Sequence, residues 1–190
     1  MEYNRQTSPE GKVKNIYARG ADDGAWMGLC LVALGGCMAG AMHTALLSVP
    51  AFALMAAVPV LTWFFLRRTH IAAHGMTVFS ALWMQGITMF GCGALIFGLA
   101  AFVYLKWVDP DFIATVLSTA AGYYENIDDP TGNAAELADE LEAIVKNHAV
   151  PSSGSVVLSW MWLIVFSGSL LSMVVAAVVK LRGVGATRRN

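Results

Sequence analysis

The sequence predicts an all-α integral membrane protein: a bundle of four transmembrane helices, with an extramembrane helical hairpin between the third and fourth helices. Two observations carry this prediction. Of the 190 residues, 57% are hydrophobic and 13% are charged, whereas soluble domains carry about 25% charged residues. The charges also leave residues 24–66, 69–105 and 147–179 without any Asp, Glu, Lys or Arg. The net charge of −1 gives no indication of a nucleic-acid partner.

The first uncharged segment has room for two membrane helices, because a bilayer core about 30 Å thick needs about 20 apolar residues per helix. The sequence Ser48-Val49-Pro50 favours a turn, so we expect the first helix at residues 26–47 and the second at 51–66. Pro59 lies inside the second helix and predicts a kink, because proline removes a backbone hydrogen-bond donor.

The two later uncharged segments predict one helix each. The third helix is expected at residues 86–105, after an interfacial stretch or helical extension at residues 71–85, in which Trp83 and Gln85 mark the level of the headgroups. The fourth helix is expected at residues 156–179. The chain is therefore divided into a cytoplasmic N-terminal segment (1–23), transmembrane helices one to three (24–108), a periplasmic acidic hairpin (109–154), and the fourth helix with a basic cytoplasmic tail (155–190).

The basic residues predict the orientation of these helices in the membrane. Cytoplasmic loops and ends carry an excess of Lys and Arg. If both termini are cytoplasmic, only Lys106 and Lys146 remain on the outer side. We therefore expect both termini in the cytoplasm. The basic residues on that side are Arg5, Lys12, Lys14, Arg19, Arg67, Arg68, Lys180, Arg182, Arg188 and Arg189.

The predicted outer hairpin occupies the only long polar segment between membrane helices. Apolar residues recur at helical spacing over residues 111–124, and after a cluster of helix-breaking residues at 128–133, Asn133 can cap a second helix that ends near Asn147. The acidic face of this second helix could bind a divalent cation or a cationic ligand, but an ordinary solvated face is favoured because the spacing of a calcium loop is missing. The acidic residues are Glu136, Asp139, Glu140 and Glu142.

A short motif, Trp107-Val108-Asp109-Pro110-Asp111-Phe112, joins the third helix to the hairpin. Asp109 precedes a proline and is biased away from helical backbone, so the third helix should end there. Pro110 suits the first position of the next helix, with Asp109 as its cap and Asp111 near the positive end of the helix dipole. We therefore favour a structural role over a catalytic one for both aspartates.

Few side chains in the predicted membrane helices carry chemistry. Ion-coupled transport usually requires ionisable groups in the membrane, and here we expect no charged residue and one histidine, His43. His70 and His74 could share a metal ion, but contact with headgroups is favoured beside Arg67 and Arg68. These two arginines predict a cytoplasmic collar that attracts anionic lipid, at roughly 1 kcal/mol per basic residue. We expect no catalytic residue, no metal and no cofactor; a lipid-linked phosphate at the collar is the preferred ligand if there is one.

Small residues spaced four apart indicate close packing between helices. In lipid, such stripes let two backbones approach closely. We favour packing within the chain's own bundle over a dedicated interface with another protein. The residues that carry this prediction are Gly24, Gly28, Gly36 and Gly40 on the first helix and Gly86 and Gly93 on the third.

The aromatic-aliphatic-Asp-Pro-Asp-Phe motif at residues 107–112, at the end of a long apolar helix, resembles the bacterial membrane family called domain of unknown function 4199. The resemblance extends over roughly residues 17–179 and includes Phe79, Gly86 and Tyr104. It implies four helices with one outer hairpin in the bacterial inner membrane. It also implies an association with enzymes that load sugars onto polyprenyl phosphate, and hence an accessory role.

Taken with the absence of a recognisable reaction centre, these features predict a non-catalytic accessory subunit or membrane anchor for a partner enzyme. The expected partners are the lipid bilayer and another membrane protein or a second copy of the chain, with no nucleic acid. The alternative is a small oligomeric channel or lipid transporter built around the Gly-rich third helix. In that case His43, Pro59 and Gln85 would line or gate the path.

Overall fold

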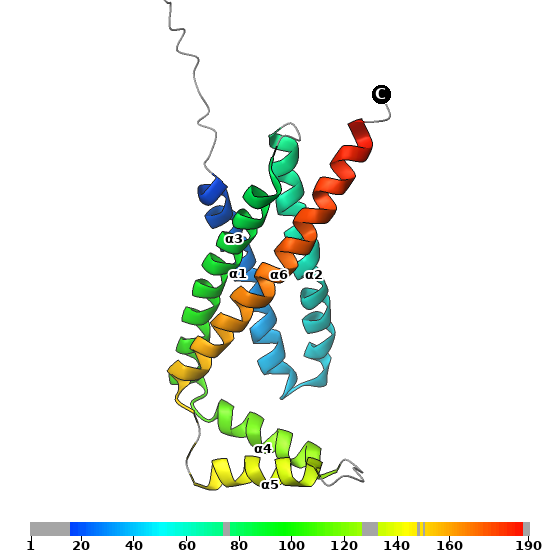
Figure 1. The fold of residues 1–190 in the computed structure, drawn as a ribbon. Coiled ribbons are helices and arrows are strands. Elements are labelled where there is room, and N and C mark those ends of the chain that lie inside the picture. Colours follow the sequence, from blue (N-terminus) through cyan, green and yellow to red (C-terminus); the bar gives the residue numbers. More distant parts are fainter. Residues whose placement is uncertain (1–15, 74–76, 127–132, 148, 150, 188–190) are drawn as a thin grey trace, which may run out of the picture.

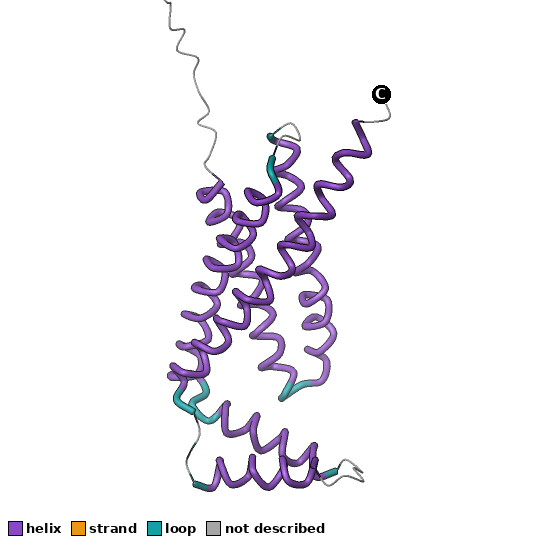
Figure 2. Tube along the Cα trace, in the orientation of Figure 1, coloured by secondary structure: helices purple, strands orange, loops and turns teal. Residues whose placement is uncertain are grey.

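The structure is a computed structural model that describes residues 16–73, 77–126, 133–147, 149 and 151–187 (Figure 1). Every regular element in this part of the chain is helical (Figure 2), which confirms the predicted all-α fold class. In chain order the elements are α1 (Ile16–Ala41), the short 3-10 helix η1 (Ala45–Leu47), α2 (Ser48–Ala72), α3 (Phe79–Val103), the π-turn η2 (Tyr104–Val108), α4 (Phe112–Glu125), α5 (Asn133–Lys146) and α6 (Ser153–Thr187).

Four helical segments within the described residues are long and apolar enough to cross a membrane. At a rise of 1.5 Å per residue, each exceeds the roughly 30 Å of a bilayer core. The four predicted crossings are therefore confirmed as candidate spans, and the chain has the character of a multi-pass membrane protein. The spans are Tyr17–Ala41, Ala45–Ala72, Phe79–Val108 and Ser153–Leu181.

The first span begins earlier than the sequence predicted. It starts at Tyr17 instead of residue 26, and therefore contains Arg19, Asp22 and Asp23. The prediction that the membrane helices carry no Asp, Glu, Lys or Arg is thus wrong. Uncharged segments mark the stretch that must be apolar, whereas a helix can continue through charges that are paired or close to the headgroups.

The break between the first two spans is also displaced from the prediction. Residues 42–44 form the turn, and Pro50 lies in the first turn of α2, where the missing proline N–H leaves no helical hydrogen bond unmade. The second helix then continues past Arg67 and Arg68 to Ala72, instead of ending at residue 66. Pro59 lies inside this helix, as expected.

The third span corrects the predicted interfacial stretch at residues 71–85. Part of that stretch ends α2, and Phe79–Val103 forms α3 directly. Gln85 is fully buried between helices, so its amide contacts neighbouring helices and is covered from headgroups. An amide side chain can lie inside a bundle when neighbouring side chains provide hydrogen-bond partners, as described below.

The four spanning helices pack with α3 between α1 and α6, while α2 contacts α1 and α6. Met27, Leu66, Leu82, Met89 and Ala176 form the centre of the bundle and are at most 1% exposed. The start of α1, the end of α2, the start of α3 and the end of α6 lie at one end of the bundle (Figure 1). We call this the terminal end, and the opposite one the hairpin end.

Helices α4 and α5 form a separate layer across the hairpin end (Figure 1). They pack against each other. Three small side chains on these two helices, Ala121, Ala134 and Ala138, are buried. Their observed ranges match the predicted helices at 111–124 and 133–147 to within a residue or so. The predicted helix-breaking cluster at 128–133 lies outside the described residues except for Asn133.

Candidate functional site

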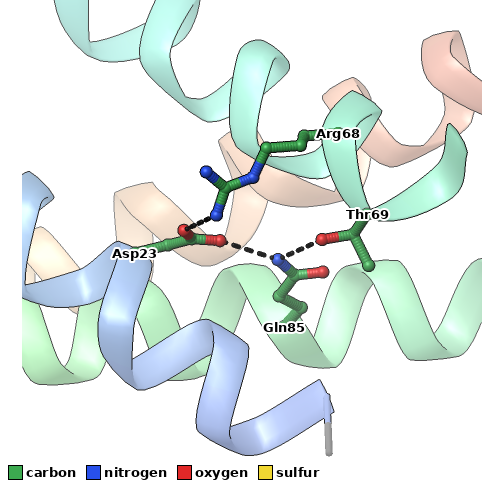
Figure 3. A network of polar contacts seen from close by, with 4 residues as sticks. All are labelled: Asp23, Arg68, Thr69 and Gln85. Atoms are coloured by element: carbon green, nitrogen blue, oxygen red, sulfur yellow. Dashed lines mark hydrogen bonds and ion pairs between the residues drawn. The ribbon is translucent and has the colours of Figure 1, made fainter. Parts of the chain in front are cut away.

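A buried carboxylate, Asp23, lies at the terminal end of the bundle (Figure 3). Its side chain is 2% exposed. Arg68 on α2 donates a hydrogen bond from Nη2 to Asp23 Oδ1 at 3.0 Å, and Gln85 on α3 donates from Nε2 to Asp23 Oδ2 at 3.0 Å. Both carboxylate oxygens of Asp23 therefore have a hydrogen-bond partner, and one of these partners, Arg68, is positively charged.

The Gln85 amide connects this ion pair to a third side chain. Its Nε2 also donates to Thr69 Oγ1 at 2.9 Å, so the two protons of one nitrogen reach α1 and α2 together (Figure 3). The Gln85 Oε1 atom is buried without a hydrogen-bond partner. Asp23, Arg68, Thr69 and Gln85 thus form one network, which joins three of the four spanning helices.

The path of the chain brings these residues together. A short turn makes α1 and α2 antiparallel, so Asp23 near the start of α1 lies beside Arg68 and Thr69 near the end of α2. Helix α3 starts at the same end and places Gln85 in its second turn. Gly20 permits the final approach, since a Cβ there would lie 3.0 Å from the Gln85 carbonyl oxygen.

The ion pair extends from the interior to the surface. Arg68 is 61% exposed while Asp23 is buried, so the guanidinium keeps contact with its surroundings while it neutralises the carboxylate. Removing one partner of such a pair would leave an unpaired charge in a low-dielectric environment. An ionisable side chain inside a membrane helix is by default a candidate functional residue.

A cleft of about 490 Å³ opens beside the network, between α1 and α2. Cavities of roughly 300–1,000 Å³ are typical of small-molecule sites. We call it the α1–α2 cleft. Its polar lining comes from Asp22, Asp23, Trp26 and Arg68, and the rest from Leu29, Cys30, Leu61 and Phe65.

The two arginines of the predicted basic collar have different partners. Arg68 pairs with Asp23, whereas the Arg67 guanidinium lies 4.9 Å from the centroid of the Trp63 ring, on the same helix. A cation over an aromatic face is stabilised by the ring quadrupole. Only Arg68 therefore lines the α1–α2 cleft.

His70 is buried and shares a hydrogen bond with Thr77, between its Nδ1 and the threonine Oγ1. Its ring is therefore bonded to a neighbouring side chain, whereas the sequence favoured a contact with headgroups. His74 lies outside the described residues. No group of three His, Cys, Asp or Glu side chains in the described part of the chain could hold a metal ion.

Most of the predicted packing glycines lie at contacts within the bundle. A Cβ on Gly24 would lie 2.7 Å from the Met89 carbonyl oxygen, and one on Gly28 would lie 2.9 Å from Ile96 Cβ. Gly93 faces the same stretch of α1, where a Cβ would lie 3.3 Å from the Gly28 backbone nitrogen. These glycines bring α1 and α3 together.

The remaining predicted glycines have different surroundings. A Cβ on Gly86 would collide with Ser172 of α6, and one on Gly40 would lie 2.9 Å from Leu47 Cδ2. Gly36 has no atom within 4 Å of the corresponding position. Gly36 therefore faces away from the other described helices, unlike its neighbours in the stripe.

The motif at residues 107–112 forms a helix end and a turn. Helix η2 ends at Val108, immediately before Asp109 as predicted, and the Asp109 backbone N–H donates to the Tyr104 carbonyl at 3.0 Å. The predicted cap was misplaced, because α4 begins at Phe112 with Asp111 as its N-cap and no side-chain cap hydrogen bond. Pro110 and Asp111, which were expected in the first turn of the helix, instead form the turn that precedes it.

The two aromatic residues of this motif lie in different surroundings. Phe112 packs edge-on against Tyr104, with ring centroids 5.6 Å apart, which ties the start of α4 to the end of the third span. Trp107 is 70% exposed. A tryptophan at the end of a spanning helix is suited to the boundary between lipid tails and headgroups.

The acidic side chains of α5 are exposed, as Glu136, Asp139, Glu140 and Glu142 all lie on its outer surface. Lys146 donates a hydrogen bond to Glu142 at 2.8 Å, one helical turn away. This bond lowers the pKa of Glu142 and raises that of Lys146.

The structure does not bring His43, Pro59 and Gln85 together. His43 lies in the turn at the hairpin end and is exposed, as is Pro59 on α2, whereas Gln85 is buried in the network at the terminal end. The three residues expected to line a transport path therefore have unrelated surroundings.

The network itself was missed at the sequence level, although signals for it were present. Gly20 and Gly24 flank Asp23 on the same helix, and Gln85 is the one amide-bearing residue in the uncharged segment 69–105. A carboxylate beside a small-residue stripe is a sign that a helix continues through the charge. A lone glutamine in an apolar segment is a sign of a partner on another helix.

Comparison with known proteins agrees with the resemblance noted in the sequence. The family described as "Protein of unknown function (DUF4199)" matches residues 24–180, a range that begins within the first span at Gly24, after Asp23, and continues through the other spans and the α4–α5 hairpin as far as Lys180. No curated protein and no solved structure matches the chain. Because the matched region covers well over half of its length, the chain belongs to the DUF4199 family.

Proposed function

We propose that the chain is a non-catalytic accessory subunit of the bacterial inner membrane, which holds a partner protein through the α4–α5 hairpin. In this arrangement both termini are cytoplasmic and the hairpin lies outside. The basic residues at the terminal end support this orientation, since Arg19, Arg67, Arg68 and Lys180 all lie there.

The observation that carries the proposal is the way the hairpin packs. Helices α4 and α5 contact each other more extensively than either contacts the spanning helices, so much of their surface remains uncovered in the described chain. Tyr123 is 70% exposed and Leu137 is 46% exposed, on helices that also carry exposed carboxylates. Exposed aromatic and aliphatic residues rimmed by polar groups are typical of protein interfaces.

The proposed class of partner follows from the family resemblance. Enzymes that load sugars onto polyprenyl phosphate work at the membrane surface, and a small multi-pass subunit could anchor or orient such an enzyme. The acidic face of α5 favours a partner with a basic surface, because complementary charges speed encounter and suppress incorrect partners.

Purification of the tagged chain in a mild detergent, followed by native mass spectrometry, tests the proposal. We expect the wild type to retain a second protein. The double variant Tyr123→Ser, Leu137→Ser should retain at least about tenfold less of it, equivalent to roughly 1.4 kcal/mol. The matched control is Ala135→Ser, another exposed position on the hairpin, which should retain as much as the wild type.

A wild-type chain that is monomeric in every mild detergent would contradict the accessory role. Equal retention of the second protein by the double variant and the control would show that these hairpin residues are not part of the interface. Solute or lipid flux through vesicles containing the purified chain alone would instead favour the channel or transporter.

A further inference from the structure

We propose that the α1–α2 cleft holds one membrane phospholipid, with phosphate oxygens at the Arg68 guanidinium and an acyl chain along the apolar end of the cleft. The site recognises the phosphodiester that these lipids share and does not select the group attached to it. In this respect it differs from a collar that attracts anionic lipid generally. This proposal does not depend on the hairpin or its partner.

The lining residues form a stripe on each of the two helices. On α1, Asp22, Trp26 and Leu29 are spaced four and then three residues apart, so they share one face of the helix. On α2, Leu61 and Phe65 share a face with Arg68 at the same spacing. The cleft therefore runs along the spanning helices, in the direction that a lipid molecule takes in a bilayer.

The antiparallel helices give the cleft a polar end and an apolar end. Asp23 and Arg68 are bonded across it at the terminal end. Leu29 and Leu61 lie seven residues further into the membrane than Asp22 and Arg68, about 10 Å at 1.5 Å per residue. A phospholipid has the same order of groups, with its phosphate at the surface and its acyl chains toward the middle of the bilayer. A free phosphate would leave the apolar end unfilled.

The ion pair presents its positive partner to the cleft. The Asp23 side chain is 2% exposed, whereas that of Arg68 is 61% exposed. Arg68 uses Nη2 for its bond to Asp23 (Figure 3), and a guanidinium carries five N–H donors. Arginine is well suited to a phosphate, because two parallel N–H donors match two phosphate oxygens. The exposed side of the guanidinium can therefore bind a phosphate while the ion pair stays intact.

The buried network holds Arg68 in place for this contact. Gln85 fixes Asp23 from the α3 side, and Asp23 in turn fixes the guanidinium of Arg68. A side chain that is already ordered loses less conformational entropy when a ligand binds. Gln85 and Asp23 therefore act as positioning residues for the phosphate contact.

The carboxylates of the lining are not available to the group attached to the phosphate. Both oxygens of Asp23 accept hydrogen bonds within the network, and Asp22 also has an interaction within the chain. An ammonium therefore gains no carboxylate partner from these two residues. The lining has no excess of positive charge either, since its charged residues are two aspartates and one arginine. Recognition therefore depends on the directed N–H donors of Arg68, and a negatively charged headgroup gains nothing over a zwitterionic one.

Competition between four lipids tests this assignment. The full chain would be reconstituted into vesicles of equal parts phosphatidylethanolamine, phosphatidylcholine, phosphatidylglycerol and glucosyldiacylglycerol, which has no phosphate. After extraction into mild detergent, native mass spectrometry would count the retained lipids. We expect one retained phospholipid per chain, with the three phospholipids retained within about twofold of one another and each at least about tenfold over the glycolipid, because the bond to a phosphate is charge-assisted.

One pair of variants tests the phosphate contact. Arg68→Ala should lower retention of the phospholipid about tenfold or more, because the N–H donors are lost. Arg67→Ala is the matched control, since the neighbouring arginine is also exposed but lies on Trp63, and it should retain as much lipid as the wild type. Arg68→Ala also unpairs Asp23 and can impair folding, so a second pair is needed.

The second pair tests the apolar end and leaves the network unchanged. Leu29→Trp places a larger side chain in the cleft and should lower retention of the phospholipid about tenfold, because the acyl chain loses its space. Leu163→Trp on α6 is the control, at a position that does not line the cleft, and should retain as much lipid as the wild type. The two leucines are 56% and 65% exposed, so neither substitution overfills the core of the bundle.

Several outcomes would overturn the proposal. Preference for phosphatidylglycerol over the two zwitterionic lipids would indicate a general anionic collar, and retention of the glycolipid at the level of the phospholipids would remove the phosphate contact. Equal retention by Leu29→Trp and Leu163→Trp would reject the cleft as the site, even if Arg68→Ala does not fold. Displacement of the lipid by excess soluble glycerophosphocholine would show that the apolar end contributes nothing, and would reject a lipid as the occupant.

Discussion

Gln85 fixes the relative positions of three helices through a single amide nitrogen. Its two N–H donors reach the Asp23 carboxylate on α1 and the Thr69 hydroxyl on α2. Lipid supplies no competing hydrogen-bond partner, so each of these groups depends on the other two. The stability of the terminal end of the bundle should therefore respond to this one residue.

Replacing Gln85 by leucine keeps the volume similar and removes both donors. We expect Gln85→Leu to lower the free energy of unfolding by about 1–2 kcal/mol, because Asp23 loses one of its two partners inside the bundle. Thermal unfolding of the purified protein in detergent measures the change. Met84→Leu, at the half-exposed neighbouring position, should melt like the wild type; equal melting of all three proteins would mean that the network contributes no stability.

At the residue level, the sequence alone predicted positions better than contacts. The end of the third span at Asp109 followed from the backbone restriction that a proline imposes on the preceding residue, which is a local effect. The partners of Asp23 are 45 and 62 residues away in the chain, and no local rule links them. Asp23 was assigned to the cytoplasmic segment because only its charge was considered.

At the level of elements, the contact between α1 and α3 depends on glycine at defined positions. Gly24, Gly28 and Gly93 lie where a methyl group would press on the backbone or a Cβ atom of the facing helix. Packing in membranes relies on such close approach, because apolar surfaces gain no hydrophobic energy from leaving lipid. The same residue type serves no such purpose at Gly36.

The comparison of Gly24→Ala with Gly36→Ala isolates this effect within one helix. A Cβ at position 24 would lie 2.7 Å from the Met89 carbonyl oxygen, so the helices must separate, and we expect a loss of about 1–3 kcal/mol. At position 36 there is open space, and alanine should be neutral or stabilising by up to about 1 kcal/mol. Thermal unfolding in one detergent compares both; similar melting would reject the packing role of Gly24.

The existence and order of the spanning helices could be predicted because hydropathy is a property of each segment. Their ends could not, because a charge-free segment and a helix are different things. Helix α1 continues outward through Asp23, which finds a partner on α2, and α2 continues through Arg67, whose charge rests on Trp63. The partner of Asp23 lies on another helix and that of Arg67 lies one turn away on the same helix, and hydropathy contains no information about either contact.

At the level of the whole molecule, most of the basic groups in the described residues lie at one end and most of the acidic groups at the other. Arg67, Arg68 and Lys180 lie at the terminal end, while the exposed carboxylates of α5 lie across the hairpin end. A membrane that favours positive charge on its cytoplasmic side would orient the protein with the hairpin outside.

Cysteine labelling of intact cells tests this orientation. In a background in which Cys30, Cys37 and Cys92 are replaced by alanine, Ala143→Cys on α5 should react with a membrane-impermeant maleimide. Lys180→Cys on α6 should react only after the cells are permeabilised. Both positions are exposed in the structure, so burial does not explain a difference, and the reverse pattern would invert the topology.

The pairing of Asp23 with Arg68 also bears on biosynthesis. When α1 leaves the ribosome, its carboxylate has no counter-ion, because the arginine is made 45 residues later. Placing a lone carboxylate in the apolar interior of a membrane costs free energy, whereas an ion pair carries no net charge. The first two helices should therefore enter the membrane jointly, as a loop, with the nascent chain waiting at the translocation machinery until the second helix has been synthesised.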